Sequence, residues 1–143
     1  MKNKSDIVQR IAAKAVITNN AGKLLILREA STYEEGNHTG RYQFPGGRID
    51  PGEPFVEGLH REVMEETGLK VKIISPLFVG EWWPTIKGNK NQIVAIFIRC
   101  EAITEDVKVS EEHDDYKWID PTEYKKYDLV DPEPEVIKTY LNL

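Results

Sequence analysis

The fold is decided by one short stretch, GGRIDPGEPFVEGLHREVMEETGL, which spans residues 46–69. Apolar residues recur within it at spacings of three and four, which predicts an amphipathic helix over Pro54–Thr67. Proline is tolerated in the first turn of a helix. Gly68 suits the C-terminal cap, because glycine adopts the left-handed conformation easily. The apolar stripe consists of Phe55, Val56, Leu59, Val63 and Met64.

The predicted helix region carries a concentration of negative charge. Five glutamates lie between positions 53 and 66, and Arg61 is the one arginine among them. Helical spacing places Glu62, Glu65 and Glu66 on one face with Cβ atoms about 5–6 Å apart, where each like-charged pair costs a few tenths of a kcal/mol. Arg61 can pair with Glu65, but two carboxylates then remain without a counter-charge. The five glutamates are Glu53, Glu57, Glu62, Glu65 and Glu66.

A bound divalent cation would resolve this repulsion, whereas the alternative is a solvated acidic helix face. Mg²⁺ prefers carboxylate oxygens and water, and it commonly bridges to substrate phosphates. The Pro45-Gly46-Gly47 turn lets the backbone approach such a site, so a glycine carbonyl is a further candidate ligand. Gly58 lies inside the predicted helix, where glycine costs about 1 kcal/mol relative to alanine. A close packing neighbour would account for Gly58.

Composition and charge exclude several classes of function. The 143 residues suit a single domain, 1–143, that can bury a core. The net charge of −5 argues against broad binding to nucleic acid or to an anionic membrane, although a metal could still bring in a small anionic ligand. The single cysteine, Cys100, excludes an internal disulfide and favours a cytoplasmic location. There is no signal-peptide pattern, and no apolar run approaches the ~20 residues of a membrane span.

Strand signals on both sides of the helix predict a mixed sheet in an α/β or α+β fold. Ile11–Ile17 and Lys23–Leu27 flank a turn signal and predict a hairpin. Gln92–Ala102 is apolar enough to be a central strand. Loops are expected over Glu29–Arg41 and 104–115. Further strands are predicted over Tyr42–Phe44, over Val71–Trp83 with a break at Pro76, and over Tyr116–Ile119, and helical segments are predicted from Pro121 and over Pro134–Leu141.

Residues 47–69 resemble the Nudix box of the Nudix hydrolases. The box requires Gly, five residues, Glu, seven residues, Arg-Glu, an aliphatic residue, any residue, Glu-Glu, any residue, Gly and an aliphatic residue. The hairpin, the Phe-Pro-Gly-Gly lead-in and the segment around Trp118 also resemble this family, from about residue 10 onward. The nine matching positions within the 23-residue box are Gly47, Glu53, Arg61, Glu62, Val63, Glu65, Glu66, Gly68 and Leu69.

The resemblance implies an α/β fold of the Nudix type, an α/β/α sandwich with a mixed β-sheet. It also implies hydrolysis of a pyrophosphate bond in a nucleoside diphosphate linked to another moiety, with Mg²⁺ or Mn²⁺ as cofactor. Arg61 would orient a helix carboxylate, and Glu53 would hold Arg61 or the adjacent loop. The implied metal ligands are the carbonyl of Gly46 and the carboxylates of Glu62, Glu65 and Glu66.

A general base must remove a proton from the attacking water. The family places this base either on the helix or on a loop after the long central strand. The helix candidates are Glu65 and Glu66. The loop candidates are Glu111 and Glu112, of which Glu112 is preferred.

Three further residues are candidate substrate contacts. Arg28 could contact a phosphate, Phe44 could form a wall of the pocket, and Trp82 could stack on a base. The alternatives are a surface cation for Arg28 and core packing for the two aromatic residues.

The expected substrate is a nucleoside triphosphate, modified or unmodified. The short chain resembles MutT-like enzymes of this type. ADP-ribose or a sugar nucleotide is the alternative, because Pro84 lies fifteen residues after Leu69, a spacing associated with ADP-ribose pyrophosphatases. A non-catalytic ligand sensor is a third possibility, but such domains commonly lose glutamates of the box, and none is lost here. We expect no stable nucleic-acid or membrane partner, and homodimers are common among the proteins that this chain resembles.

Overall fold

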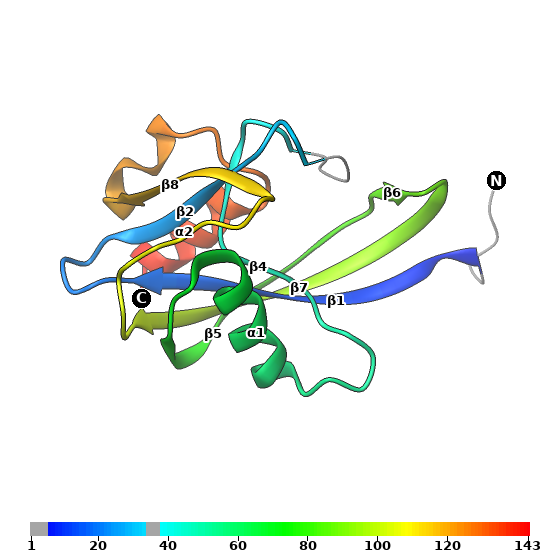
Figure 1. The fold of residues 1–143 in the computed structure, drawn as a ribbon, viewed down its shortest axis with the longest axis horizontal. Coiled ribbons are helices and arrows are strands. Elements are labelled where there is room, and N and C mark those ends of the chain that lie inside the picture. The colour runs from blue at the N-terminus through cyan, green and yellow to red at the C-terminus, as the bar shows by residue number, and fades with distance from the viewer. Residues whose placement is uncertain (1–5, 34–37) are drawn as a thin grey trace.

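Two long strands lie side by side in the middle of the sheet. A computed structural model describes residues 6–33 and 38–143 of the protein. Strand β1 (Val8–Thr18) runs parallel to β7 (Asn89–Ala102) along its whole length (Figure 1). Both strands were predicted, and both are longer than their apolar runs.

The other strands join this central pair through antiparallel ladders. The strands are β2 (Leu24–Glu29), β3 (Tyr42–Gln43), β4 (Gly46–Arg48), β5 (Val71–Trp82), β6 (Thr85–Ile86) and β8 (His113–Ile119), and the helices are α1 (Phe55–Thr67), a 3₁₀ helix (Pro121–Lys126) and α2 (Glu133–Leu141). The order in the sheet is β3–β2–β1–β7–β5, while β4 pairs with β1, β6 with β7 and β8 with β2. The predicted hairpin is present as β1 and β2, and the sheet is mixed, as expected.

Helices cover both faces of this sheet. Successive strand residues point to opposite faces, so β1 contributes alternate residues to two hydrophobic clusters. One cluster contains Leu59 and Val63 of α1, and the other contains Val136 and Ile137 of α2. Within the described residues, no helix is long and apolar enough to cross a membrane. The architecture is therefore the predicted α/β/α sandwich.

The boundaries of some elements differ from the sequence prediction. Strand β5 continues through Pro76, where a break was expected, and its pairing with β7 shifts register on either side of this residue. Such irregularities let a strand accept a proline, which cannot donate to the ladder. The loop expected over 104–115 ends earlier, because β8 begins at His113. Residues 34–37 of the predicted loop Glu29–Arg41 lie outside the described residues.

Helix α1 agrees closely with its prediction. Pro54 is the N-cap residue, and Gly68 closes the helix with a φ of 72°, donating its N–H to the carbonyl of Met64. A Cβ at Gly58 would lie 2.5 Å from Cδ1 of Ile49. The close neighbour expected at Gly58 is therefore confirmed, and the loop before α1 packs tightly against the helix.

Candidate active site

A groove runs past β4, the face of α1 and the loop before β8. It consists of three adjoining cavities, which we call the central cavity (about 520 Å³), the acidic cavity (about 690 Å³) and the tryptophan cavity (about 620 Å³). The central and acidic cavities share Tyr33, Glu62, Glu66 and Glu112, and the central and tryptophan cavities share Lys14, Gln43, Trp82 and Ile93. Because they share these wall residues, the three cavities adjoin one another.

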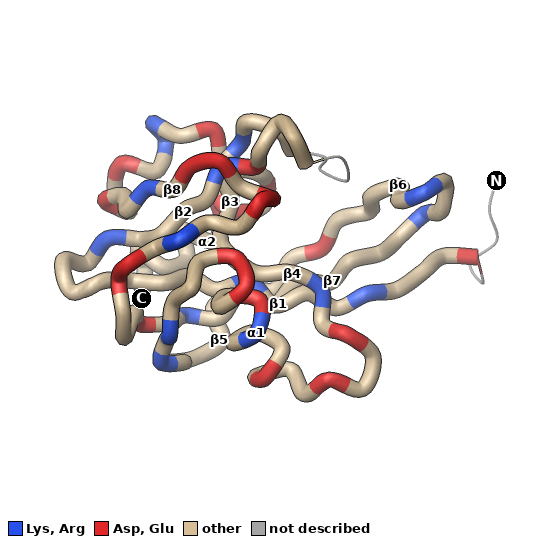
Figure 2. Tube along the Cα trace, in the orientation of Figure 1, with Lys and Arg blue, Asp and Glu red and all other residues tan. Residues whose placement is uncertain are grey.

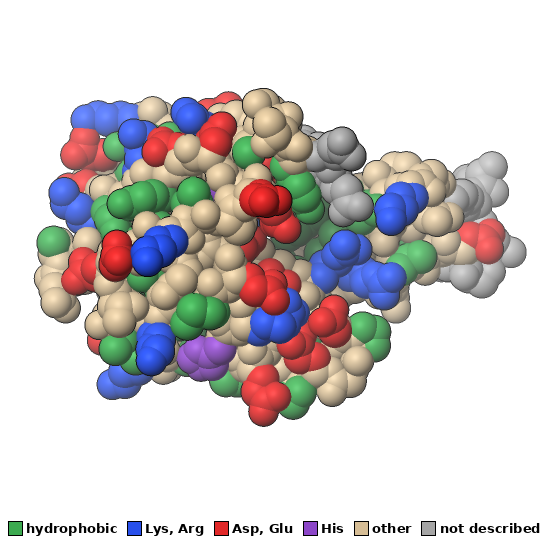
Figure 3. Space-filling model, in the orientation of Figure 1, with side chains coloured by type: hydrophobic (Ala, Val, Ile, Leu, Met, Phe, Trp, Pro, Cys, Tyr) green, Lys and Arg blue, Asp and Glu red, His purple; other side chains and the backbone are tan. Residues whose placement is uncertain are grey.

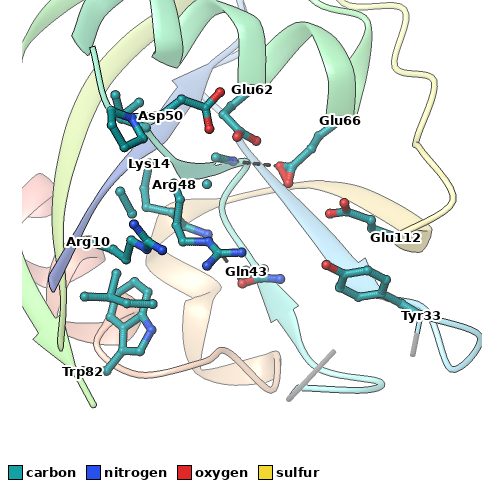
Figure 4. A pocket seen from close by; sticks show the side chains of 16 residues that line it. Arg10, Lys14, Tyr33, Gln43, Arg48, Asp50, Glu62, Glu66, Trp82 and Glu112 are labelled. Carbon is teal, nitrogen blue, oxygen red and sulfur yellow. Dashed lines mark hydrogen bonds between the residues drawn. The ribbon is translucent and has the colours of Figure 1, made fainter. Parts of the chain in front are cut away.

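Glu66 is the most enclosed of the three helix carboxylates. It is 7% exposed, and its Oε2 accepts a hydrogen bond of 2.8 Å from the N–H of Gly46 (Figure 4). Burial raises the pKa of Glu66 to about 8, against the charge of Lys14 and the hydrogen bond from Gly46. Burial also raises the pKa of Glu62. A Cβ on Gly47 would lie 2.7 Å from a carboxylate oxygen of Glu62, so only glycine permits this close approach.

The loop before β8 adds a further carboxylate next to those of α1. A carboxylate oxygen of Glu66, one of Glu112 and a ring nitrogen of His113 lie within 4.8 Å of one another. The Ala30 N–H donates to the Glu112 carbonyl at 2.8 Å and holds this loop against the end of β2. Burial lowers the pKa of His113 to about 4, so its imidazole is neutral at pH 7, and Nδ1 has no hydrogen-bond partner within the described part of the chain. Glu112 lines two of the cavities, whereas Glu111 lines the acidic cavity alone.

Arg61 joins the loop before α1 to the helix carboxylates. Its Nε donates to Oε2 of Glu53 at 2.6 Å, and its Nη2 donates to Oε1 at 2.9 Å. Hydrogen bonds from Arg61, and then from the N–H of Asp50, lower the pKa of Glu53 to about 2. Nη1 donates to Glu62 at 3.1 Å and to Glu65 at 3.2 Å. Arg61 thus donates hydrogen bonds to two helix carboxylates, whereas one was predicted from the sequence. Glu66 is held by other residues.

Three cations line the central cavity opposite these carboxylates. Arg10 and Lys14 lie on the same face of β1, and Arg48 of β4 pairs with Ala12 between them. Figure 4 shows Arg10 and Arg48 between Glu62 and Trp82. These cations were not among the site residues predicted from the sequence. The sequence pattern that could have indicated them is the alternation in Arg10-Ile11-Ala12-Ala13-Lys14. It puts two positive side chains on one face of a largely apolar strand.

The surface around the groove shows this separation of charge. The tube view places acidic residues of α1 near acidic residues of the loop before β8 (Figure 2). In the space-filling view, acidic and basic side chains gather around a hollow in this face of the molecule (Figure 3). The hollow therefore offers carboxylates for a cation and basic groups for an anion, although the net charge of the chain is −5.

The structure brings some predicted substrate contacts into the groove and leaves others outside. Trp82 lines both the central and the tryptophan cavities, and Glu65 lines the acidic cavity. Arg28 instead donates to Asp114 at 2.7 Å and is not among the residues that line these three cavities. Phe44 is 1% exposed and packs edge-on against Phe97 in the core, so it corresponds to the packing alternative.

The groups in the central cavity fit a hard divalent cation. Glu62, Glu66 and Glu112 offer carboxylate oxygens, and Gly46 lies in the same wall. Oxygen ligands of this kind suit Mg²⁺ and Mn²⁺. The pKa of Glu66 is raised by burial, so a cation that replaces its proton would offset the cost of the buried charge.

Comparisons with known proteins agree with this geometry. The model of the NUDIX domain matches residues 8–140. Nucleoside triphosphatase NudI of Escherichia coli O81 (strain ED1a) is 32% identical over 120 residues, which cover 79% of this chain and 84% of NudI. The MutT protein from Methanosarcina mazei Go1 has a similar crystal structure, with a TM-score of 0.84, 25% identity and 96% coverage of both chains.

The fold likeness extends to an enzyme of another substrate class. An ADP-ribose pyrophosphatase from Streptococcus suis 89-1591 has a TM-score of 0.69 at 17% identity, covering 93% of this chain and 90% of that one. This likeness concerns the fold alone. The matched domain and the NudI relative indicate the same family as the complete box at residues 47–69. The chain belongs to the Nudix hydrolase family, as its box predicted, and it is a pyrophosphohydrolase.

Proposed function

We propose that this protein is a Mg²⁺-dependent nucleoside triphosphate pyrophosphohydrolase. The observation that carries this proposal is the central cavity, where the buried carboxylate of Glu66 and the carboxylates of Glu62 and Glu112 share one space with three cations. A triphosphate that binds a divalent cation through some oxygens and arginine through others is complementary to this arrangement. The NudI relative, a nucleoside triphosphatase, supports the same substrate class.

The cation would be held by helix α1 and the turn before it. Its ligands would be the Gly46 carbonyl and carboxylates of Glu62, Glu65 and Glu66. When bound, it would neutralise phosphate charge and make water more acidic. Glu65 is 58% exposed and already held by Arg61, whereas Glu66 is buried, so we assign the dominant role to Glu66.

The remaining groups would bind the substrate and move the proton. Glu112 would accept the proton of the attacking water at a carboxylate oxygen, from its place beside Glu66. The water oxygen forms a bond to one phosphorus while the bridging P–O bond breaks. Arg10 and Arg48 would bind phosphate oxygens away from the reacting phosphorus.

A product screen tests this proposal. Purified protein with Mg²⁺ or Mn²⁺ is assayed against dNTPs, modified dNTPs, ADP-ribose, sugar nucleotides and dinucleoside polyphosphates. Glu66→Gln serves as the inactive variant. Glu57→Gln is the matched control, because Glu57 lies exposed in the first turn of the same helix.

We expect hydrolysis of triphosphates by the natural protein and by the Glu57→Gln control, and a loss of several orders of magnitude in Glu66→Gln. Hydrolysis of ADP-ribose without hydrolysis of any triphosphate would contradict the proposed substrate. Metal binding without turnover of any compound would indicate a ligand sensor instead.

A further inference from the structure

We propose that His113 supplies a nitrogen ligand to a second divalent cation, which Glu66 and Glu112 also bind, and that this second cation position takes Mn²⁺ in preference to Mg²⁺. The resemblance to the Nudix box implies oxygen ligands alone. The inference goes beyond the proposed function, because it concerns a cation position with a different set of ligands and does not depend on which substrate is hydrolysed.

Three donor atoms from two separate segments of the chain converge at this position. A carboxylate oxygen of Glu66, one of Glu112 and a ring nitrogen of His113 all lie within 4.8 Å of one another. Ligand atoms that are each about 2.1 Å from one ion lie within about 4.2 Å of each other. Small rotations of the side chains are therefore enough to bring all three donors onto one ion.

This group of donors is distinct from the carboxylates that Arg61 holds. Figure 4 shows Glu66 between Glu62 and Glu112. Glu62 accepts a hydrogen bond from Arg61 at 3.1 Å, and within the described residues it is not a member of the group of three donors. Because a carboxylate has two oxygens, Glu66 can bind one cation beside Glu62 and a second one beside Glu112. Glu112 likewise keeps one oxygen for the proton that it would accept from water.

The imidazole of His113 is buried without a hydrogen-bond partner. The residue is 5% exposed, and its Nδ1 is enclosed and unpaired in the part of the chain that the structure describes. The hydroxyl of Ser110 is also buried and unpaired there, and Ser110 lines the acidic cavity together with Glu66. Buried polar groups are nearly always paired, because an unpaired one has lost its bonds to water. Two such groups next to one pair of carboxylates point to a bound ion and its water.

Backbone contacts on both sides fix the position of His113. Its N–H donates to the carbonyl of Ser110 at 3.1 Å, and the N–H of Ser110 donates to the carbonyl of Glu66 at 3.3 Å. The next residue, Asp114, points to the opposite face of β8 and pairs with Arg28 of β2 at 2.7 Å. The start of β8 is therefore tied to both α1 and β2. The donors are held near one another before an ion binds, which lowers the cost of binding.

The mixed set of donors determines which ion is preferred. Mg²⁺ is a hard ion that binds oxygen and gives up its water reluctantly. Imidazole nitrogen suits transition-metal ions, and affinity rises from Mn²⁺ to Co²⁺ at a given site. The charge of Lys14 acts on both Glu66 and His113 and opposes a cation, but the carboxylates of Glu62, Glu66 and Glu112 outnumber it. The second cation position therefore favours Mn²⁺ over Mg²⁺.

Pulsed EPR of bound Mn²⁺ tests this proposal on the natural protein, prepared without a histidine tag. Electron spin echo envelope modulation detects nitrogen that is bonded to Mn²⁺, and labelling histidine alone with ¹⁵N shows whether that nitrogen belongs to an imidazole. With less than one equivalent of Mn²⁺ in excess Mg²⁺, we expect ¹⁴N modulation that changes to the ¹⁵N pattern after labelling. Bound Mn²⁺ without coupling to a histidine nitrogen would overturn the proposal.

Variants assign the nitrogen to one of the three histidines of the chain. His113→Gln should abolish the coupling and weaken Mn²⁺ binding by about 10- to 100-fold, with a smaller loss for Mg²⁺. His60→Gln is the matched control, because His60 lies exposed on α1, and it should keep the coupling. The double variant His38→Gln/His60→Gln leaves His113 as the only histidine, so it decides the assignment even where His113→Gln fails to fold. Loss of the coupling in this double variant would overturn the proposal.

Hydrolysis assays separate this proposal from the proposed function. Hydrolysis of triphosphates with Mg²⁺, together with Mn²⁺ that shows no histidine nitrogen, would overturn the second cation position and leave the proposed function intact. A histidine-bound Mn²⁺ without hydrolysis of any triphosphate would contradict the proposed substrate and support the second cation position.

Discussion

Glu66 combines deep burial with an ionisable carboxyl in the proposed metal site. Its carboxylate is almost fully buried next to Glu62 and Glu112, and its pKa is raised to about 8. Such a group is costly in the free protein, and the proposed cation would offset this cost when it binds. The amide of a glutamine in its place could still accept the N–H of Gly46 but would carry no charge.

The first prediction concerns Glu66→Gln. It should reduce turnover of a triphosphate by several orders of magnitude. Without metal at pH 8 it should raise the melting temperature, because the substitution removes a buried charge. Mg²⁺ should stabilise the natural protein by mass action and stabilise the variant much less. Thermal unfolding with Mg²⁺ and with EDTA measures this, and equal stabilisation of both proteins would contradict the role of Glu66.

The second prediction concerns Arg61, which positions Glu62 and Glu65 through hydrogen bonds. Arg61→Lys should lower kcat or raise the Mg²⁺ concentration needed for activity by about 10- to 100-fold. Lysine retains the charge but cannot make the bidentate contact to Glu53. Full activity at unchanged Mg²⁺ requirement would show that charge alone suffices at this position.

At the scale of the element, the turn and helix of the box form one rigid unit. Gly47 lies against Glu62, and Gly58 lies against Ile49 and Glu53. The side chains of the helix and of the loop before it therefore approach the backbone at these two glycines more closely than a Cβ would permit without a shift. This packing holds the carboxylates in place before any ligand binds.

The third prediction follows from Gly58. At a solvent-exposed position of a helix, replacing glycine with alanine would stabilise the protein by about 1 kcal/mol. Here the added Cβ would meet Ile49 at 2.5 Å and Glu53 at 2.9 Å, so we expect Gly58→Ala to lower the free energy of unfolding by about 1–3 kcal/mol. Denaturant unfolding gives this value. A gain in stability would mean that the loop before α1 moves easily to make room for the Cβ. That loop would then not hold Arg61 in place through Glu53.

Sequence analysis predicted the elements of the box well because local signals specify them. Helix periodicity, the cap at Gly68 and the spacing of the glutamates depend on neighbours a few residues apart. The break predicted at Pro76 is wrong, because a shift in strand pairing accommodates this proline without interrupting β5. The sequence alone could not place the side chains of Arg28 and Phe44, because their directions depend on partners far away in the chain, Asp114 and Phe97.

At the scale of the whole molecule, the groove joins segments that are distant in sequence. Lys14 of β1 and Glu133 of α2 meet across 119 positions, and nothing local predicts that contact. Likewise, the cations of β1 and β4 face a helix on the other side of the cavity. The carboxylates of the proposed metal site could therefore be named from the sequence, whereas the cations that line the central cavity became apparent only in the fold.

The fourth prediction tests the phosphate side. Arg10→Gln and Arg48→Gln should each raise KM for a triphosphate by about 10-fold with a smaller effect on kcat, because we propose that these residues bind phosphate away from the reacting atoms. High salt should weaken substrate binding in the natural protein more than in either variant. Steady-state kinetics at two ionic strengths measures both effects. A fall in kcat alone would place the arginines in the chemical step instead.

The fifth prediction concerns the pH dependence of stability without metal. Burial raises the pKa of Glu66 to about 8 and that of Glu133 to about 7, from a usual value of 4.5. Between pH 6.5 and 8 the unfolded chain has already lost these protons, so stability must fall as pH rises, on the order of a few kcal/mol for the two groups. His113 opposes this trend only weakly, because its pKa is about 4 when folded and 6.5 ordinarily, so that the unfolded imidazole has already lost half of its protons at pH 6.5.

Denaturant unfolding in EDTA at pH 6.5 and pH 8 measures this slope. Glu66→Gln and Glu133→Gln should each reduce it, and the double variant should be nearly flat. A natural protein whose stability is constant or rises over this range would show that the two carboxyls are already ionised at pH 6.5.

The most direct measurement is hydrolysis of a dNTP in H₂¹⁸O, with products identified by ³¹P NMR and mass spectrometry. The natural protein with Mg²⁺ should place one ¹⁸O in one phosphate-containing product, Glu57→Gln should do the same, and EDTA or Glu66→Gln should abolish the reaction. Hydrolysis that persists in Glu66→Gln or in EDTA would contradict a metal site built on the carboxylates of α1. The absence of ¹⁸O from the products would contradict attack by water.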